Sequence, residues 1–212
     1  MNPICHIVGA GEICAKDLDE LKKKKPNDYI IAADGGFRFL ADNGIMPDIL
    51  IGDFDSLKES HVHIPESLPI HRLNPVKDYT DMHTSIQHGL SKGFKNFKLY
   101  GAVGGRIDHT IANIQLLSWL ANLNCNARML SCENTFDILH NSEIYFPAHM
   151  KGFISVFSLS EKSTGVYERG LKYELTDATL TSTFPLGVSN EFTGTKSLIK
   201  VTEGTLLIVS PR

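Results

Sequence analysis

The first half of the chain contains four short apolar runs, and each run ends in a cluster of glycine or aspartate. Runs of four or five apolar residues are typical of buried strands in a parallel sheet. Segments with helical spacing lie between the runs, and strands joined through helices pair in parallel. The sequence therefore predicts an α/β unit that presents its polar residues at one edge of a sheet. The clusters occupy residues 9–11, 34–36, 53–55 and 101–105.

The last third of the chain has a different pattern, because helical periodicity disappears after about residue 127. Short runs rich in Thr, Ser and Val follow, and Glu203-Gly204 is a hairpin signal between the last two. We expect strands at residues 153–159, around residue 167, and at residues 171–175, 178–183, 197–201 and 205–209. The predicted fold class is α/β, with a Rossmann-like domain at residues 1–130 and a small all-β sandwich at residues 131–212.

Composition narrows the function classes. The 212 residues are 42% hydrophobic and 21% charged with a net charge of −3, which is ordinary for a globular protein and offers no basic field for nucleic acid. No run approaches the roughly 20 apolar residues that span a bilayer, and the N-terminus does not resemble a signal peptide. Four cysteines without a CxxC spacing indicate reduced thiols, so we expect a cytoplasmic protein and no cysteine metal site.

The pair Asp53 and Asp55 follows the apolar run 49–51 and Gly52. In an extended chain, alternation places both carboxylates on one side, where they repel each other unless a cation lies between them. Oxygen ligands at the end of a buried strand suit Mg²⁺. A solvated acidic turn is the alternative interpretation of this short motif.

The glycine-rich segment 101–105 leads into a predicted helix through Arg106 and Asp108. Glycines let backbone approach a phosphate, and the helix N-terminus adds a positive dipole. The segment matches neither Walker A nor GxGxxG, and a tight strand-to-helix turn is the alternative. We expect the helix to bury a stripe formed by Ile107, Ile111, Ile114, Leu117 and Leu120. A second helix is predicted from the N-cap Thr80, with Asp81 in its first turn and Lys77 and Asp78 just before it.

Four motifs taken together resemble the thiamine pyrophosphokinase family. They are Asp34-Gly-Gly, Gly52-Asp-Phe-Asp-Ser56, Asp78-Tyr-Thr-Asp81 and Gly104-Gly-Arg-Ile-Asp-His109. The resemblance is strong over about residues 1–125 and looser at residues 170–173, 189–190 and 203–207. The set is far more specific than any one motif.

The resemblance implies an enzyme that transfers diphosphate from ATP to the hydroxyl of thiamine, giving thiamine diphosphate and AMP, with Mg²⁺ as cofactor. It implies metal ligands at Asp53, Asp55 and Asp81, and catalytic roles for these three together with Asp34, Arg106 and Asp108. The implied ATP-binding residues are Gly35, Gly36, Lys77, Thr80, Gly104, Gly105, Arg106 and Asp108.

The resemblance also implies a homodimer, with thiamine held between the α/β domain of one subunit and the β domain of the other. Ser189 and Asn190 would form the substrate-facing turn. Phe184 and Phe192 are the candidates for an aromatic side chain that stacks on thiamine.

Two other functions use the same sequence features. In a haloacid-dehalogenase-like Mg²⁺-dependent phosphatase, Asp53 would be the covalent nucleophile, although Ser56-Leu57 departs from that pattern. In a non-catalytic nucleotide-binding module, the same carboxylates would bind Mg²⁺ and ATP without turnover.

Overall fold

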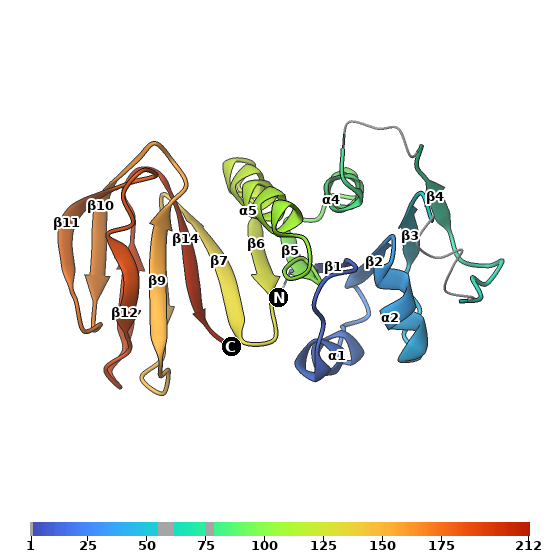
Figure 1. Cartoon of the computed structure of the whole chain (residues 1–212), viewed down its shortest axis with the longest axis horizontal. Coiled ribbons are helices and arrows are strands. Elements are labelled where there is room, and N and C mark those ends of the chain that lie inside the picture. The colour runs from blue at the N-terminus through green and yellow to red at the C-terminus, as the bar shows by residue number, and fades with distance from the viewer. Residues whose placement is uncertain (1, 55–61, 75–78) are drawn as a thin grey trace. The chain divides into compact units, whose positions relative to one another are not determined.

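The computed structural model describes residues 2–54, 62–74 and 79–212, and the chain divides into two compact units (Figure 1). Unit 1 consists of Met1–Leu116 and Cys125–Cys132, and unit 2 of Leu117–Asn124 and Glu133–Arg212. In the described part of the chain, no helix has the length and apolar character needed to cross a membrane.

Unit 1 contains a parallel sheet of six strands in the order β6-β5-β1-β2-β3-β4. The four apolar runs form β1, β2, β3 and β5, so the predicted parallel pairing of these runs is confirmed. Strand β6 had no clear signal in the sequence. The strands are β1 (Cys5–Val8), β2 (Tyr29–Ala33), β3 (Ile49–Gly52), β4 (Ile70–Arg72), β5 (Asn96–Tyr100) and β6 (Asn126–Leu130).

Helices α1 (Ala15–Lys22) and α2 (Gly36–Asp42) lie on one face of this sheet and α4 (Asp81–Ser91) on the other (Figure 1). Successive side chains of β1 point to opposite faces of the sheet, so this strand packs against the helices on both faces. Val8 belongs to the core cluster that contains Leu21 and Phe37 from the first two helices. On the opposite face, a Cβ on Gly89 of α4 would lie 2.9 Å from Sγ of Cys5, so this helix packs closely on the sheet.

Helix α5 (Ile107–Asn122) differs from its prediction in which side chains it buries. Leu117 and Leu120 are fully buried, whereas Ile107 and Ile111 are 75% and 55% exposed. The predicted stripe was therefore wrong over the first turns. Its i, i+4 spacing is correct for one helix face, but spacing does not determine where along a helix the packing partner ends.

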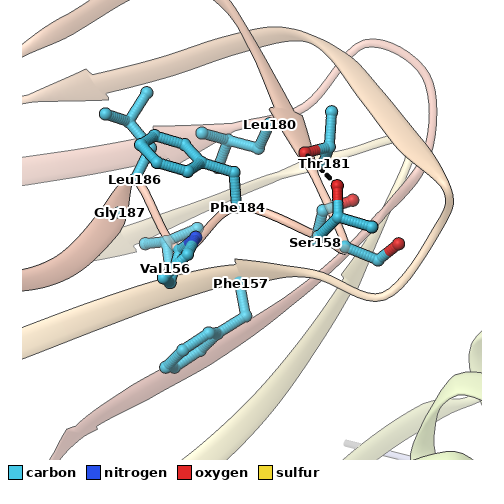
Figure 2. A pocket seen from close by; sticks show the side chains of 11 residues that line it. Val156, Phe157, Ser158, Leu180, Thr181, Phe184, Leu186 and Gly187 are labelled. Carbon is cyan, nitrogen blue, oxygen red and sulfur yellow. Dashed lines mark hydrogen bonds between the residues drawn. The ribbon is translucent and has the colours of Figure 1, made fainter.

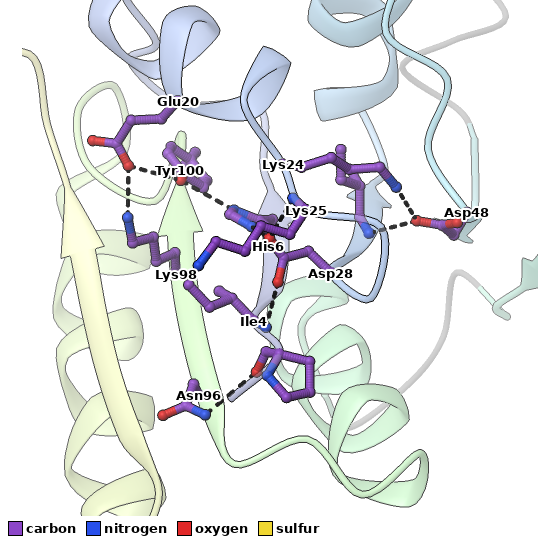
Figure 3. A network of polar contacts seen from close by, with 12 residues as sticks. Ile4, His6, Glu20, Lys24, Lys25, Asp28, Asp48, Asn96, Lys98 and Tyr100 are labelled. Atoms are coloured by element: carbon purple, nitrogen blue, oxygen red, sulfur yellow. Dashed lines mark hydrogen bonds and ion pairs between the residues drawn. The ribbon is translucent and has the colours of Figure 1, made fainter. Parts of the chain in front are cut away.

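A polar network connects β1 and β5 with helix α1 (Figure 3). His6 Nδ1 lies 3.1 Å from the Tyr100 hydroxyl, which donates to Glu20, and Lys98 also donates to Glu20 at 2.8 Å. Burial lowers the pKa of His6, while the nearby carboxylate of Asp28 opposes this shift. These contacts extend along the strands as far as Tyr100, the last residue of β5, which directly precedes the glycine cluster at residues 101–105.

Unit 2 is built from two antiparallel sheets, in the orders β12-β9-β14-β7 and β11-β10-β13-β8. Both sheets contribute to one apolar core, for example Val156 and Leu206 from the first and Val166 and Ile199 from the second. The predicted antiparallel β unit is confirmed. The strands are β7 (Asn134–His140), β8 (Glu143–Phe146), β9 (Phe153–Ser158), β10 (Lys162–Arg169), β11 (Leu175–Thr181), β12 (Gly187–Glu191), β13 (Ser197–Lys200) and β14 (Thr205–Pro211).

The segment 171–175 was predicted as a strand, but residues 171–174 form a connection with a single bridge from Leu171 to Phe192, and Leu175 begins β11. Strands β7, β8 and β12 were not predicted. Asp137 interrupts the apolar pattern of β7, and β8 is only four residues long, so neither gives a strong periodic signal.

Candidate active site

A pocket of about 110 Å³ lies at the carboxyl edge of the unit 1 sheet. We call it the glycine pocket, because four glycines line it together with the starts of α4 and α5. Such a position is expected, since the strand order reverses between β1 and β5, and ligands of open α/β sheets bind at this reversal. Its lining residues are Gly9, Ala10, Gly11, Ala33, Thr80, Asp81, Met82, Gly101, Ala102, Gly104, His109 and Asn113.

The backbones of the two loops that leave β1 and β5 lie directly against each other. Gly11 N donates to Gly101 O and Glu12 N donates to Val103 O, both at 2.8 Å. A Cβ on Gly101 would lie 2.3 Å from Gly9 O, and the residue has a φ of +57°. Only glycine combines this conformation with this close approach.

We therefore expect Gly101→Ala to lower the free energy of unfolding by at least about 2 kcal/mol, because it adds a backbone clash to the strain of a positive φ. Gly44→Ala is the matched control, since Gly44 has a φ of +68° but nothing within 4 Å of its Cβ position. Urea unfolding of both variants measures the difference. Equal losses in the two variants would show that the close approach does not matter.

Three of the predicted site residues that the structure describes line the glycine pocket: Thr80, Asp81 and Gly104. The predicted N-cap is confirmed, since Thr80 Oγ1 accepts a hydrogen bond from His83 N at 3.1 Å. Asp81 follows in the first turn of α4, where the positive end of the helix dipole favours a carboxylate.

Sequence reasoning did not select His109 and Asn113, which also line the pocket. They are spaced i, i+4 on α5 and so share one face of the helix. Asn113 is buried and its side-chain amide donates to Ala102 O at 2.7 Å, which fixes the loop after β5 to the helix. The sequence did contain a signal for this site, because Asn113 is a polar residue one turn after His109 in a largely apolar helix.

Asp34 follows Ala33, which ends β2 and lines the pocket, and Asp53 follows the end of the neighbouring strand β3. Asp34 has a φ of 45°, and its backbone N–H donates to Ile51 O at 2.8 Å, which ties the two strand ends together. Backbone strain of this kind concentrates at functional sites. The following residues, Gly35 and Gly36, begin α2, and a Cβ on Gly36 would lie 1.9 Å from Val8 O.

The extended backbone that was predicted between Asp53 and Asp55 is not present. Phe54 has a φ of 67°, so the chain between the two carboxylates is not extended. The ring of Phe54 is buried and lies under the guanidinium of Arg72 on β4, at 4.8 Å. Asp55, Lys77 and Asp78 lie outside the described residues.

Arg106 and Asp108 bind each other at the start of α5. Arg106 Nε donates to Asp108 Oδ1 at 3.2 Å, and a second guanidinium nitrogen binds the other carboxylate oxygen. Hydrogen bonding to Arg106 lowers the pKa of Asp108, and the pKa of Arg106 is raised in return. Both side chains are exposed, and with Gly105 they lie next to Gly104 rather than in the pocket lining.

A metal ion that is held by protein side chains alone needs several ligand atoms close to one another. Within residues 2–54, 62–74 and 79–212, neither Asp53 nor Asp81 belongs to a group of three ligand side chains within 4.8 Å of one another. One or two carboxylates together with phosphate oxygens are enough for Mg²⁺. Asp53 and Asp81 supply oxygen donors of the type that Mg²⁺ prefers.

Ser189 and Asn190 lie within strand β12 of unit 2, so the predicted turn was wrong. The register between β12 and β9 shifts between Gly187 and Asn190, and Ser189 at the shift has a φ of 62°. Ser189 is exposed, whereas Asn190 is buried. Val188 is exposed as well, and the bulge explains why these two adjacent residues, Val188 and Ser189, do not alternate.

The carboxamide of Asn190 connects three segments of unit 2. Its Oδ1 accepts from Tyr173 N at 2.9 Å, and its Nδ2 donates to Tyr173 O and to Glu168 Oε2, both at 2.7 Å. Glu168 is fully buried, and burial raises its pKa to about 7, although the Asn190 hydrogen bond opposes the shift. Asn190 therefore has a structural role that its sequence motif did not reveal.

This raised pKa predicts a pH-dependent stability. Because the folded state favours protonated Glu168, its stabilising contribution is complete below the unfolded pKa of about 4.5 and is lost as pH rises through about 7. Glu168→Gln stays neutral, so at pH 8 we expect it to be more stable than the wild type, by up to about 3 kcal/mol. Near pH 4.5 this advantage should disappear. Unfolding at both pH values measures this, with the exposed Glu161→Gln as control; identical pH profiles for all three proteins would contradict it.

The structure distinguishes the two candidate stacking residues. Phe192 is buried and packs on Phe146, with ring centroids 5.5 Å apart. Phe184 is 65% exposed and lies beside Leu180 and Leu186 at a pocket of about 240 Å³ (Figure 2). Of the two, Phe184 is the ring that a ligand can reach.

The fold and the pocket define a class of protein in which a parallel α/β unit, with a glycine-lined pocket at its strand reversal, is joined to an antiparallel β unit. The model of the thiamin pyrophosphokinase catalytic domain matches residues 21–129, and that of the thiamin pyrophosphokinase vitamin B1 binding domain matches residues 140–206. The chain belongs to the thiamin pyrophosphokinase family, which is a family of enzymes.

Individual relatives agree with this assignment. The thiamine pyrophosphokinase of Bacillus subtilis is 30% identical over 182 residues, covering 84% of this chain and 85% of the relative. A crystal structure of thiamine pyrophosphokinase from Bacillus subtilis has a TM-score of 0.83 at 25% identity and covers 98% of both chains. A family protein from Enterococcus faecalis shares the fold, with a TM-score of 0.82 at 22% identity over 100% of this chain and 99% of that chain.

The comparisons support neither of the alternative functions, the dehalogenase-like phosphatase and the non-catalytic nucleotide-binding module. Both family models match along the chain in the order catalytic domain, then vitamin-binding domain.

Proposed function

We propose that the protein transfers a diphosphate group from ATP to the hydroxyl of thiamine, giving thiamine diphosphate and AMP. The observation that carries the proposal is the glycine pocket at the strand reversal, bordered by Asp81 and lying within the matched catalytic region. The thiamine oxygen bonds to the β-phosphorus, the bond from that phosphorus to the bridging oxygen breaks, and AMP leaves with the oxygen. The hydroxyl proton passes to a carboxylate at the sheet edge or to water.

The pocket offers what such a transfer requires, namely positioning and neutralisation of charge. Gly101 and Gly104 leave room for phosphate oxygens close to the backbone, and α4 and α5 both begin at the pocket. Asp53 and Asp81, with Asp55, would hold Mg²⁺, because a hard cation prefers carboxylate oxygens. When bound, the ion neutralises phosphate charge. Asp34, held by its strained backbone, is proposed to lie near the reacting groups.

The remaining proposed ATP contacts involve Gly35, Gly36, Lys77, Thr80 and Gly105. Arg106 is proposed to exchange its partner Asp108 for a phosphate group of ATP, since the planar guanidinium binds both oxyanions through paired hydrogen bonds.

Unit 2 is proposed to supply the thiamine surface. Phe184 offers an exposed ring for the flat, cationic ligand, and Ser189 an exposed hydroxyl.

We infer that two copies assemble, with the β-sandwich at residues 131–212 of one completing the site on the Rossmann-like domain at residues 1–130 of the other. Exposed apolar side chains of unit 2, such as Phe153 and Val188, support an interface. The free cysteines support a cytoplasmic location.

Purified protein mixed with ATP, Mg²⁺ and thiamine is expected to form AMP and thiamine diphosphate in equal amounts, measured by chromatography. Omitting thiamine should abolish AMP formation. Release of orthophosphate without thiamine would support the phosphatase alternative, and ATP binding without products would support a non-catalytic role. Light scattering after size-exclusion chromatography should give twice the mass of one chain.

Arg106→Ala is expected to lower kcat/KM for ATP by about 10- to 100-fold, because it removes a charge-assisted contact to phosphate. Arg106→Lys should restore only part of the loss, since lysine cannot form the paired contact. Arg38→Ala is the control, because Arg38 is an exposed arginine of unit 1 that also pairs with a carboxylate, that of Asp42 at 3.7 Å. Full recovery with lysine would show that guanidinium geometry is not needed.

A further inference from the structure

The fold brings together two cysteines that are far apart in the sequence. Cys14 precedes α1, and Cys132 follows β6. Their sulfur atoms and a carboxylate oxygen of Asp17 all lie within 4.8 Å of one another. We call these three residues the thiol cluster; it lies wholly in unit 1 and includes none of the residues proposed for catalysis.

The start of α1 holds the thiol cluster in place. Asp17 is fully buried, and its Oδ2 accepts from Cys14 N at 2.8 Å, so the carboxylate is fixed beside the Cys14 side chain. Glu12 lies near the Cys132 thiol but does not belong to the group of ligand atoms within 4.8 Å of one another. The backbone of Glu12 is fixed in turn by its hydrogen bond to Val103 O at 2.8 Å.

We propose that the thiol cluster is a binding site for a divalent metal ion of the zinc type, with Cys14, Cys132 and Asp17 as ligands. Two thiolates and one carboxylate leave the fourth position of a tetrahedral ion for a water molecule, as in zinc sites that have three protein ligands. A zinc–sulfur distance of about 2.3 Å requires the sulfurs to lie roughly 3.8 Å apart, which is compatible with the observed spacing. Each thiol releases its proton to solvent as its sulfur bonds to the metal.

The same residues do not suit the other chemistry of paired cysteines, disulfide formation. Oxidation requires attack by a thiolate, and burial, followed by interactions with Cys14 and Glu12, raises the pKa of the Cys132 thiol to about 12, which disfavours that anion. A divalent cation instead relieves the accumulated negative charge. Sulfur ligands also distinguish this site from the proposed Mg²⁺ ligands, which are all oxygens.

Cobalt titration of the reduced, metal-free full chain tests the proposal directly. Co²⁺ should produce the near-ultraviolet absorption of thiolate coordination and saturate at one ion per chain. Zn²⁺ should abolish the absorption, and excess Mg²⁺ should not. Cys132→Ser and Cys14→Ser should each lower the affinity for Co²⁺ by at least about 10- to 100-fold, the range found for loss of a supporting residue.

Cys125→Ala is the matched control, because it also removes one of the four cysteines but lies outside the thiol cluster. It should keep the absorption and the stoichiometry, and circular dichroism establishes that all variants are folded. The proposal is overturned if the wild type shows no thiolate absorption, or if the absorption survives in both serine variants. Oxidation of Cys14 and Cys132 to a disulfide in a protein that binds no Co²⁺ would also overturn it. None of these results depends on transferase activity.

Discussion

Replacing Asp81 by asparagine is expected to lower kcat for thiamine diphosphate formation by about 100- to 1,000-fold, the loss typical when one charge-stabilising group is removed from a preorganised site. Asp81 lines the glycine pocket at the start of α4, and the amide keeps the shape of the side chain but removes its charge. Steady-state kinetics over a range of Mg²⁺ concentrations measure the effect. The requirement for Mg²⁺ should rise as well. Asp53→Asn should behave in the same way.

Measuring the stability of Asp81→Asn distinguishes a loss of catalysis from a folding defect. An aspartate in the first turn stabilises its helix by only about 0.3–1 kcal/mol, so Asp81→Asn should remain folded. Asp42→Asn is the control, since Asp42 is an exposed carboxylate at the end of α2. It should keep wild-type activity. Near wild-type turnover of Asp81→Asn at limiting Mg²⁺ would refute the proposed ligand role.

Asn190→Ala is expected to lower the free energy of unfolding by about 3–5 kcal/mol at pH 8, where Glu168 is ionised. The substitution removes the hydrogen bonds to both Tyr173 backbone groups and leaves the buried carboxylate of Glu168 without its amide donor. Urea unfolding measures the loss. The destabilisation should be smaller near pH 5, because a protonated carboxyl does not carry the buried charge.

Ser189→Ala provides the neighbouring control. Ser189 is exposed and its side chain is not part of the Asn190 network, so its free energy of unfolding should change by less than about 0.5 kcal/mol. If Asn190→Ala had wild-type stability but weak thiamine binding, Asn190 would contact the ligand rather than support the fold. Any activity loss in Asn190→Ala must therefore be judged at a pH and temperature where the variant is folded.

Local signals predicted much of the fold. Apolar runs ending in glycine or aspartate identified β1, β2, β3 and β5, and parallel pairing followed from the helices between them. Thr80 was recognisable as an N-cap because a cap depends on a few adjacent residues. The antiparallel character of unit 2 was also predictable, although short or interrupted strands such as β7 and β8 were not.

The errors concern features that depend on distant contacts. Asn190 is buried because β12 bulges against β9 and faces Glu168 of another sheet, and nothing in the motif indicates this. Cys14 and Cys132 have no zinc-like spacing, yet the tertiary fold brings them together. The left-handed backbone at Phe54 has no signal in the apolar run that precedes it, and its ring contacts Arg72, which is distant in the sequence.

The polar network of β1, β5 and α1 has a consequence for how the enzyme can change over evolution. His6, Tyr100, Glu20 and Lys98 connect two strands and α1, and Tyr100 directly precedes Gly101, which lines the glycine pocket. Anchoring and chemistry are thus neighbours in the chain. A substitution in the network therefore reaches the pocket through one peptide bond, so changes in the scaffold and in substrate preference are coupled.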